Sequence, residues 1–162
     1  MSSFPKKLKS LRALVSLISK AKQSGRTVVF TNGCFDLLHA GHVRCLKEAR
    51  SLGDLLVVGL NRDASVRRLK GRGRPVMPEK DRAEVLSALE CVDYLVFFSE
   101  QTPEKLIRAL CPDFLVKGGD WKKGSIAGAA FVRSYGGKVS SLGFANGYST
   151  TAMIKKIKKI DA

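Results

Sequence analysis

The chain contains only two histidines, His39 and His42, and they lie three residues apart in the segment TNGCFDLLHAGH (31–42). At the start of a helix, residues i and i+3 are neighbours on one face, so the two imidazoles can point together. The first turn of a helix also offers free backbone N–H groups and the positive end of the helix dipole, both of which suit phosphate. The pair therefore predicts a phosphate-binding site at a helix N-terminus.

Two glycines in the same segment support this interpretation. Gly33 and Gly41 carry no Cβ, so a phosphate or a base could approach the backbone closely there. The structural alternative is that the two histidines only cap the helix. A closed zinc site is disfavoured because it needs four ligands, and the chain has only two histidines and no CxxC pair. A serine hydrolase is disfavoured because the chain has no G-x-S-x-G elbow.

Short β-branched runs alternate with helical runs along the chain. We predict strands at residues 27–31, 55–60, 94–98, 113–117 and 138–142. We predict helices at residues 6–24, 40–52, 63–69, 78–90, 103–110, 125–135 and 150–160, the last capped by Ser149. The apolar stripe of the first helix is predicted to comprise Leu8, Leu11, Val15, Ile18 and Ala21. Near-continuous apolar strands that are each followed by a helix indicate an α/β fold, with a five-stranded parallel sheet covered on both faces in a three-layer, Rossmann-like arrangement.

Polar, glycine-containing segments follow four of the five predicted strands. They are TNGCFDLLHAGH, NRDAS, KGGDW and ANGYSTT, after the first, second, fourth and fifth strands. Because parallel strands end at one edge of their sheet, these segments are expected to cluster there, and ligands bind at that edge in such folds.

The formal net charge of +15 is high, with basic clusters at residues 67–74, 122–123 and 155–159. Such a field attracts nucleotides, phosphorylated metabolites, nucleic acids or anionic lipid surfaces, and charge alone does not choose among them. For the C-terminal cluster we expect a solvated helix face. No apolar run approaches the ~20 residues that a membrane helix needs. The four cysteines form no CxxC pair, which favours a reduced, cytoplasmic chain.

The segment TNGCFDLLHAGH resembles the (T/G)xFDxxHxGH signature of the cytidylyltransferase-like nucleotidyltransferase superfamily. Four further segments resemble the adenylyltransferases of ADP-heptose synthesis in bacterial lipopolysaccharide assembly: GLNRDASVRRLKGRGRPV, DRAEVLSALECVDYLVFF, PDFLVKGGDW and GYSTTAMI. The resemblance runs from about Thr27 to Ile157. It implies the nucleotidyltransferase version of the three-layer fold. It also implies transfer of AMP from ATP to D-glycero-β-D-manno-heptose 1-phosphate, in the stand-alone form rather than the form fused to a sugar kinase.

The resemblance implies that His39 and His42 are catalytic, donating hydrogen bonds to the triphosphate and to the charge that develops at the α-phosphate. Lys70 completes the predicted catalytic set by binding the α-phosphate or the sugar phosphate. The expected nucleotide-binding residues come from three signature segments and are Thr31, Asn32, Gly33, Cys34, Phe35, Gly41, Lys117, Gly118, Asp120, Gly147, Tyr148, Ser149, Thr150 and Thr151.

Acceptor binding is assigned to a second set, namely Asp36, Asn61, Arg74 and Trp121. Two of these have open alternatives: Asp36 could instead fix a structural turn or hold a metal, and Trp121 could pack. Relatives often carry a basic residue shortly before the glycine of the GYSTT signature, but this chain has FAN at 144–146. We therefore expect Lys70 or Arg74 to replace that phosphate contact.

Triphosphate chemistry implies a divalent cation, Mg²⁺ or another, with no ligands assigned. The expected partners are ATP and a sugar 1-phosphate, without nucleic acid or membrane insertion. We expect a homodimer, with the N-terminal helix or the segment 78–98 as its interface. The predicted organisation is an amphipathic helix over residues 1–25 packed on a nucleotidyltransferase domain over residues 26–162.

Two rival functions remain at this point. One is a cytidylyltransferase for glycerol 3-phosphate or ethanolamine phosphate, because the same HxGH core serves those reactions. The other is a basic nucleic-acid-binding module, which the charge allows. The chain shows no helix-turn-helix, RNA-binding or zinc-finger signature to support that module.

Overall fold

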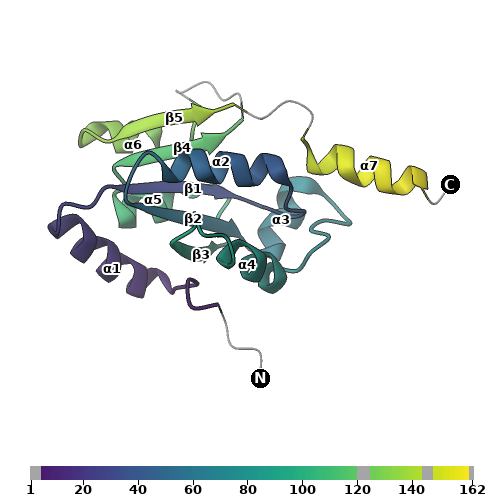
Figure 1. Ribbon diagram of the computed structural model, residues 1–162, viewed down its shortest axis with the longest axis horizontal. Helices are drawn as coiled ribbons and strands as arrows, with labels where there is room; N and C mark the ends of the chain where they lie inside the picture. The colour runs from purple at the N-terminus through teal and green to yellow at the C-terminus, as the bar shows by residue number, and fades with distance from the viewer. Residues whose placement is uncertain (1–4, 120–124, 144–147, 161–162) are drawn as a thin grey trace.

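A computed structural model describes residues 5–119, 125–143 and 148–160 (Figure 1). The strands are β1 (Val28–Gly33), β2 (Leu55–Asn61), β3 (Tyr94–Phe98), β4 (Phe114–Gly118) and β5 (Lys138–Leu142). The helices are α1 (Leu11–Gln23), α2 (Ala40–Arg50), α3 (Asp63–Lys70), α4 (Glu79–Ser87), α5 (Glu104–Leu110), α6 (Ala129–Ser134) and α7 (Thr150–Ile160). All the paired strands run parallel, in the order β3-β2-β1-β4-β5, which confirms the predicted five-stranded sheet.

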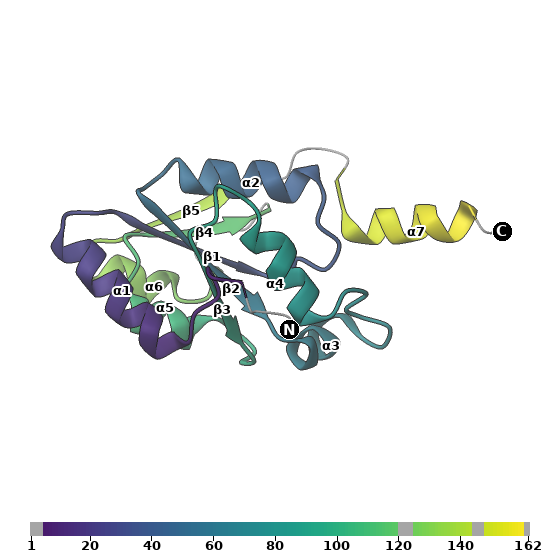
Figure 2. The same ribbon diagram turned by 60° about the horizontal axis from the view of Figure 1, so that its bottom comes forward.

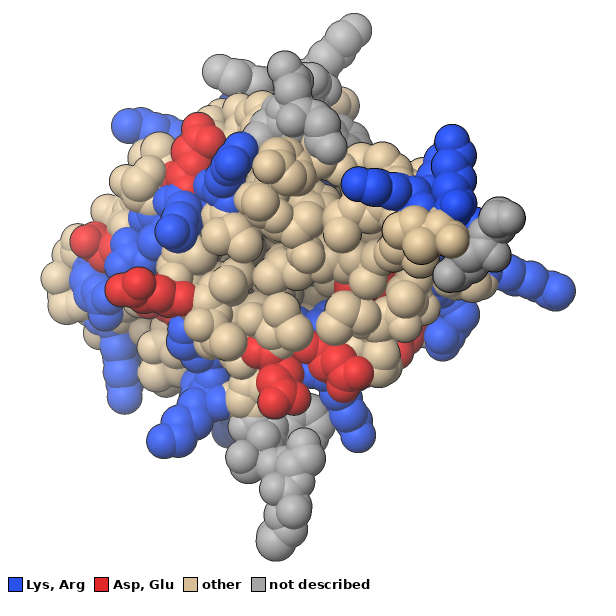
Figure 3. Space-filling model, turned by 45° about the vertical axis from the view of Figure 1, so that its right-hand side comes forward, with Lys and Arg blue, Asp and Glu red and all other residues tan. Residues whose placement is uncertain are grey.

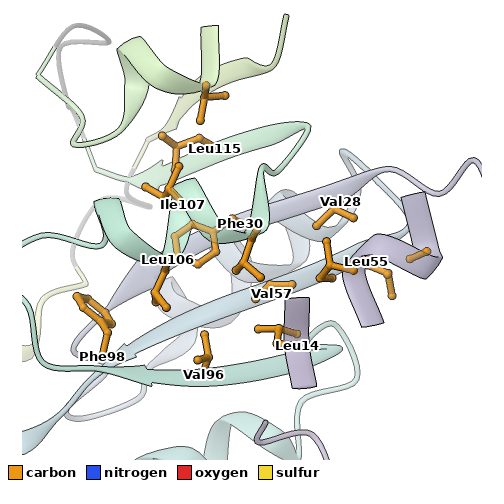
Figure 4. Packing of buried hydrophobic residues seen from close by; sticks show 14 of the residues in the cluster. Leu14, Val28, Phe30, Leu55, Val57, Val96, Phe98, Leu106, Ile107 and Leu115 are labelled. Carbon is orange, nitrogen blue, oxygen red and sulfur yellow. The ribbon is translucent and has the colours of Figure 1, made fainter. Parts of the chain in front are cut away.

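Helices cover both faces of the sheet, so the three-layer prediction is confirmed. Alternate strand residues point to opposite faces. Val28 and Phe30 pack with α1, α5 and α6 in one cluster, part of which Figure 4 shows. Val29 lies between them in sequence and packs with α2 and α4 in the other cluster. Strands buried on both faces need the unbroken apolar runs seen in the sequence.

The first helix differs from its prediction. It begins at Leu11 rather than at residue 6, after an N-cap in which the Ser10 side chain accepts a hydrogen bond from the Ala13 N–H at 3.3 Å. Its buried stripe comprises Leu14, Ile18 and Ala21. Val15, predicted to lie in that stripe, is instead 36% exposed. The apolar spacing before residue 11 therefore did not belong to the helix.

Leu8 is extended and bridges to Leu95 at the edge of the sheet. The Lys9 N–H donates to the Leu95 carbonyl, and the Leu95 N–H donates to the Lys7 carbonyl, both at 2.9 Å. These bonds satisfy backbone groups that the edge strand β3 would otherwise leave unpaired. Leu8 also packs against the cluster formed with α2 and α4, on the opposite face from α1.

Two further helices are shorter than predicted by three or more residues, whereas α7 is as predicted. The helix predicted to run to Glu90 ends at Ser87. The one predicted over 125–135 begins only after Gly128, whose φ of 83° cannot continue a right-handed helix. The Ser149 hydroxyl accepts a hydrogen bond from the Ala152 N–H at 3.2 Å, so the predicted cap of α7 is confirmed.

The direction in which the chain adds strands to the sheet reverses between β1 and β4. From β1 the chain adds β2 and β3 on one side, and it then adds β4 and β5 on the other. Pairing between β1 and β4 covers only Val29 with Phe114 and Phe30 with Leu115. Both strands continue beyond these pairs, to Gly33 and Gly118. Toward their carboxyl ends β1 and β4 therefore no longer pair with each other, and this is the switch point where open α/β sheets bind ligands.

Candidate active site

A cavity of about 670 Å³ lies at this switch point. It is lined by segments at the carboxyl ends of β1 to β4 and by the start of α7. Figure 3 brings this side of the molecule forward and shows a mostly uncharged centre, with Lys and Arg and fewer Asp and Glu side chains around it. The predicted site residues that line the cavity are Thr31, Asn32, Gly33, Cys34, Phe35, Asp36, His42, Asn61, Lys70, Arg74, Lys117, Gly118 and Thr150.

His39 and His42 cap α2 reciprocally. The His42 N–H donates to Nδ1 of His39 at 3.3 Å, and the His39 N–H donates to Nδ1 of His42 at 3.4 Å. The two rings stack with their centroids 3.8 Å apart. The structural alternative considered for this pair is thus present, but it uses only Nδ1. No hydrogen bond to a described residue occupies either Nε2.

This capping determines where each imidazole carries its proton. A neutral imidazole whose Nδ1 accepts a hydrogen bond is protonated on Nε2. Burial, with smaller contributions from the nearby His39 and Lys70, lowers the pKa of His42 to about 4. Burial also lowers the pKa of His39. At neutral pH both side chains are therefore uncharged hydrogen-bond donors through Nε2. His42 lines the cavity, whereas His39 does not and stacks on Tyr148.

Lys117 spans the gap between β1 and β4. Its ammonium donates to the backbone carbonyl of Asn32 at 3.3 Å and to the Asn32 side-chain oxygen at 3.2 Å. Burial lowers the pKa of Lys117, and the charge of Lys70 contributes in the same direction. Lys70 lines the same cavity as His42 and Lys117. The cavity therefore brings together two lysines and a histidine donor that are distant in sequence.

Asp36 is almost completely buried and holds the Gly/Arg-rich segment over residues 71–78 against the site. Its carboxylate accepts a hydrogen bond from Nε of Arg74 at 2.5 Å and from the N–H groups of Val76 and Met77 at 2.7 and 3.0 Å. The contacts support the alternative in which Asp36 fixes a structural element. They also orient Arg74 along the cavity wall.

Replacing Asp36 by Asn is expected to loosen the 71–78 segment. The amide loses the ion pair and can no longer accept all three bonds, each of which contributes roughly 1.5–3 kcal/mol when one group is charged. We expect trypsin to cleave the native protein after Lys70 and Arg72 about ten to a hundred times faster. The control is Asp81→Asn on the exposed surface of α4. Equal cleavage rates in both variants would show that Asp36 does not hold the segment.

Arg82 is a residue of this region that the sequence did not reveal. Its side chain is fully buried beneath the site. The guanidinium donates to the carbonyls of Met77, Cys34 and Asn61 at 3.0, 2.5 and 2.9 Å, and to the Asp63 carboxylate at 2.7 Å. In the sequence EKDRAEV it resembles any solvated helix residue, so no local signal could have identified it. It joins the ends of β1 and β2 to the start of α3 and to the segment before α4.

A side chain at either motif glycine would meet other protein atoms rather than open space. A Cβ on Gly33 would lie 2.9 Å from the ring of Phe35, which folds back with a φ of 44°. A Cβ on Gly41 would lie 2.8 Å from the Cβ of Tyr148. Gly41 is thus required where Tyr148 packs against α2, a packing reason that differs from the predicted approach of a ligand.

The GYSTT signature is positioned beside the histidines by its own packing. Tyr148 stacks on His39 with the centroids 5.9 Å apart, and the Arg44 guanidinium lies over its ring at 5.3 Å. Thr150 lines the cavity, and its hydroxyl donates to the Leu37 carbonyl at 3.5 Å. Thr151 is exposed on α7 and, like Ser149, does not line the cavity. The predicted residues Asp120, Trp121 and Gly147 lie outside the described residues.

Sequence reasoning also missed one wall of the cavity. Polar loops were expected after four strands, but the segment after β3 contributes as well. The cavity residues not predicted are Cys45, Leu46, Leu69, Phe98, Gln101, Thr102, Pro103, Ser125, Ile126 and Ala127. The segment SEQTP (99–103) lacks glycine and reads as an ordinary turn, so its position at the site depends on the strand order.

The described residues do not form a metal site of their own. Nowhere among residues 5–119, 125–143 and 148–160 do three His, Cys, Asp or Glu side chains come together as metal ligands would. The buried carboxylate at the cavity, Asp36, already accepts three hydrogen bonds from protein groups. A cation at this site would therefore depend chiefly on phosphate oxygens, which Mg²⁺ often uses as ligands.

In the described part of the chain, no helix is both long enough and apolar enough to span a lipid bilayer.

Comparison with known proteins relates most of the chain to one family. Residues 30–156 match the cytidylyltransferase-like family. The chain is 54% identical over 153 residues to the bifunctional protein HldE of Geobacter sulfurreducens, and 56% identical over 146 residues to that of Hydrogenovibrio crunogenus. These matches cover 94% and 90% of the chain but only 31% and 30% of the relatives. The chain thus spans about a third of the length of these proteins.

Two solved structures share the fold. The lipopolysaccharide core biosynthesis protein from Thermoplasma volcanium is 31% identical, with a TM-score of 0.62 over 77% of this chain and all of that one. The pantoate-beta-alanine ligase from Francisella tularensis superposes with a TM-score of 0.60 over 96% of this chain and 78% of its own length. At 14% identity, the ligase supports only the fold.

Proposed function

Since this chain belongs to the cytidylyltransferase-like family, we propose that it transfers AMP from ATP to D-glycero-β-D-manno-heptose 1-phosphate, giving ADP-heptose and pyrophosphate. The choice of a heptose acceptor is supported by the sequence segments that resemble this branch. It is also supported by the 31% identity to a protein of lipopolysaccharide core biosynthesis. The 54% identity to a bifunctional HldE protein covers most of this chain and agrees with the proposal.

The observation that carries the proposal is the convergence of His42, Lys70 and Lys117 on one cavity at the switch point of the sheet. An uncharged Nε2 donor and two ammonium groups suit a triphosphate and a second phosphate, since both substrates are anionic. The cavity volume of about 670 Å³ falls within the range of pockets that enclose small-molecule ligands.

In the proposed reaction, an oxygen of the sugar 1-phosphate attacks the α-phosphorus of ATP in line. The new P–O bond forms as the bond from the α-phosphorus to the β-phosphate oxygen breaks, and pyrophosphate leaves. A phosphate monoester has a second pKa near 6, so it is already ionised at neutral pH and needs no general base. Histidines that donate hydrogen bonds rather than accept protons are therefore well matched to this chemistry.

The protein contributes by positioning the phosphates and stabilising their charge. We assign His42 and His39 to the triphosphate and the α-phosphate. His42 lines the cavity, and His39 stacks on His42 without lining the cavity itself. Lys70 is assigned to the α-phosphate or the sugar phosphate, and Lys117 to the nucleotide. A divalent cation such as Mg²⁺, held by the triphosphate, would supply further charge neutralisation. We also propose a homodimer formed through α1 or the segment 78–98.

The proposal is tested by pyrophosphate release in a panel that crosses ATP, CTP, GTP and UTP with three acceptors: heptose 1-phosphate, glycerol 3-phosphate and ethanolamine phosphate. We expect ATP with heptose 1-phosphate to give a kcat/KM at least about a hundred times that of any other pair, because buried polar contacts discriminate strongly. ATP without an acceptor is the control for hydrolysis.

A higher kcat/KM with CTP and glycerol 3-phosphate or ethanolamine phosphate would instead identify a cytidylyltransferase. No release with any pair, from protein that unfolds cooperatively, would rule out both transfer reactions.

A further inference from the structure

The C-terminal helix α7 carries an apolar stripe that no other part of the described chain covers. None of its eleven residues is buried. Met153, Ile157 and Ile160 follow the spacing i, i+4, i+7 on one side of the helix, with Ile154 beside them. Their exposed fractions are 37%, 51% and 74% for the first three, and Ile154 is half-buried. Figures 1 and 2 both show α7 extending away from the sheet and its covering helices.

The opposite side of the helix is basic. At 3.6 residues per turn, Lys155, Lys156, Lys158 and Lys159 lie on that side, together with Thr151 and Ala152. The helix Thr150–Ile160 contains no Asp or Glu. The large apolar side chains and the cationic side chains thus lie on opposite sides of the helix axis. The four lysines are exposed, as expected for a solvated helix face, but the exposed isoleucine stripe opposite them was not expected from the sequence.

We propose that α7 is an interfacial anchor that binds the surface of an anionic lipid bilayer. Helices that lie in a membrane interface combine a lysine-rich face with a buried apolar face. Anionic lipids attract such lysines, and the chain's net charge of +15 adds to that attraction. The stripe would enter the boundary between headgroups and acyl chains while the lysines remain among the phosphates.

Charge decides against the other occupants of this surface. A second α7 packed against the first would bring four more lysines and no Asp or Glu, which opposes pairing of two copies through α7. A nucleic acid would satisfy the lysines but would leave the isoleucine stripe exposed. The bilayer complements both halves of the helix at once.

The anchor would hold the cavity close to the membrane. Tyr148 and Thr150, at the start of the helix, contact His39 and the Leu37 carbonyl beside the cavity. The apolar stripe begins only at Met153, so membrane binding need not displace those contacts.

The test is co-sedimentation of the full chain with vesicles at low and high salt. We compare phosphatidylcholine alone with vesicles in which phosphatidylglycerol is roughly a third of the lipid. The partition coefficient is expected to be at least about tenfold higher for the anionic vesicles and to fall as salt screens the charges. Changing all four lysines of α7 to Gln should lower it by about a hundredfold or more. Ile157→Asp should lower it about tenfold or more, since it removes apolar burial.

The matched control removes four exposed positive charges elsewhere, by changing Arg12, Lys20, Lys47 and Lys105 to Gln. It should lower partitioning much less than the α7 variant. Equal loss in both would reduce the effect to net charge and overturn the anchor. The anchor would also be overturned if the wild-type chain did not co-sediment with the anionic vesicles. Unchanged vesicle binding by Ile157→Asp would show that the apolar stripe does not enter the bilayer.

Other outcomes would identify a different occupant. A change of molar mass in solution caused by Ile157→Asp would identify a second copy as the occupant. Retention on RNA that depends on the lysines alone, without vesicle binding, would identify a nucleic acid.

Discussion

Changing His42 to Asn is expected to lower kcat by about 10²–10³-fold, the effect of removing one preorganised donor from a developing anion. The asparagine Oδ1 lies where Nδ1 of the imidazole lies, so it can still accept the His39 N–H at the start of α2. What the substitution removes is the Nε2 donor that faces the proposed phosphates. Steady-state pyrophosphate release with saturating substrates measures the effect.

The converse variant separates the two uses of the side chain. In His42→Gln the amide reaches the position of Nε2 and can donate, but the acceptor that caps the helix is lost. We expect it to retain more activity than His42→Asn and to be less stable by about 0.5–2 kcal/mol, as for other lost caps. Urea unfolding of both variants checks the stability. Wild-type kcat in His42→Asn would show that the histidine serves only as a cap.

The pH dependence of stability provides a second readout of the same residue. The pKa of His42 is about 4 in the folded chain and near 6.5 when unfolded. Between these values the unfolded chain binds the extra proton, so the stability present above about pH 6.5 is lost as the pH falls toward 4. His42→Asn should make the free energy of unfolding vary less across this window. An unchanged pH dependence would contradict the burial of a neutral imidazole.

Changing Arg82 to Met is expected to destabilise the protein by about 3–5 kcal/mol, the cost of breaking a buried ion pair from one side. The apolar side chain fills much of the space but leaves the Asp63 carboxylate and three carbonyls without their donor. The measurement is the free energy of unfolding in urea. Arg82→Lys should recover only part of the loss, because an ammonium cannot reproduce the planar fork that reaches four acceptors.

The matched control is Arg108→Ala on α5. Arg108 also forms an ion pair, with Glu104 at 2.7 Å, but its side chain is 56% exposed. Exposed pairs contribute about 0–1 kcal/mol, so the control should remain near wild-type stability. Comparable losses in the two variants would mean that Arg82 is no more than a surface arginine. Because Cys34 and Asn61 line the cavity, folded Arg82→Lys should also have a reduced kcat/KM.

Local sequence patterns determined the fold class and most of the elements. The apolar strands and the Ser149 cap were recognisable because a strand buried on both faces needs an unbroken apolar run, and a helix start needs a side-chain acceptor. The polar segments after the strands indicated the edge of the sheet where ligands bind, because parallel strands all end at that edge. The spacing of His39 and His42 was sufficient to predict that their rings meet.

Only the tertiary structure decided which distant groups meet. Arg82 is buried because the carbonyls of Cys34, Asn61 and Met77 surround it, and nothing within its own helix indicates that. Asp36 was ambiguous until its partners proved to lie about forty residues away, at Arg74 and the residues that follow it. The strand order brought the loop after β3 into the cavity wall. Hydrogen bonds and packing act over a few ångströms in space, so local spacing predicts them only when both partners lie within one element.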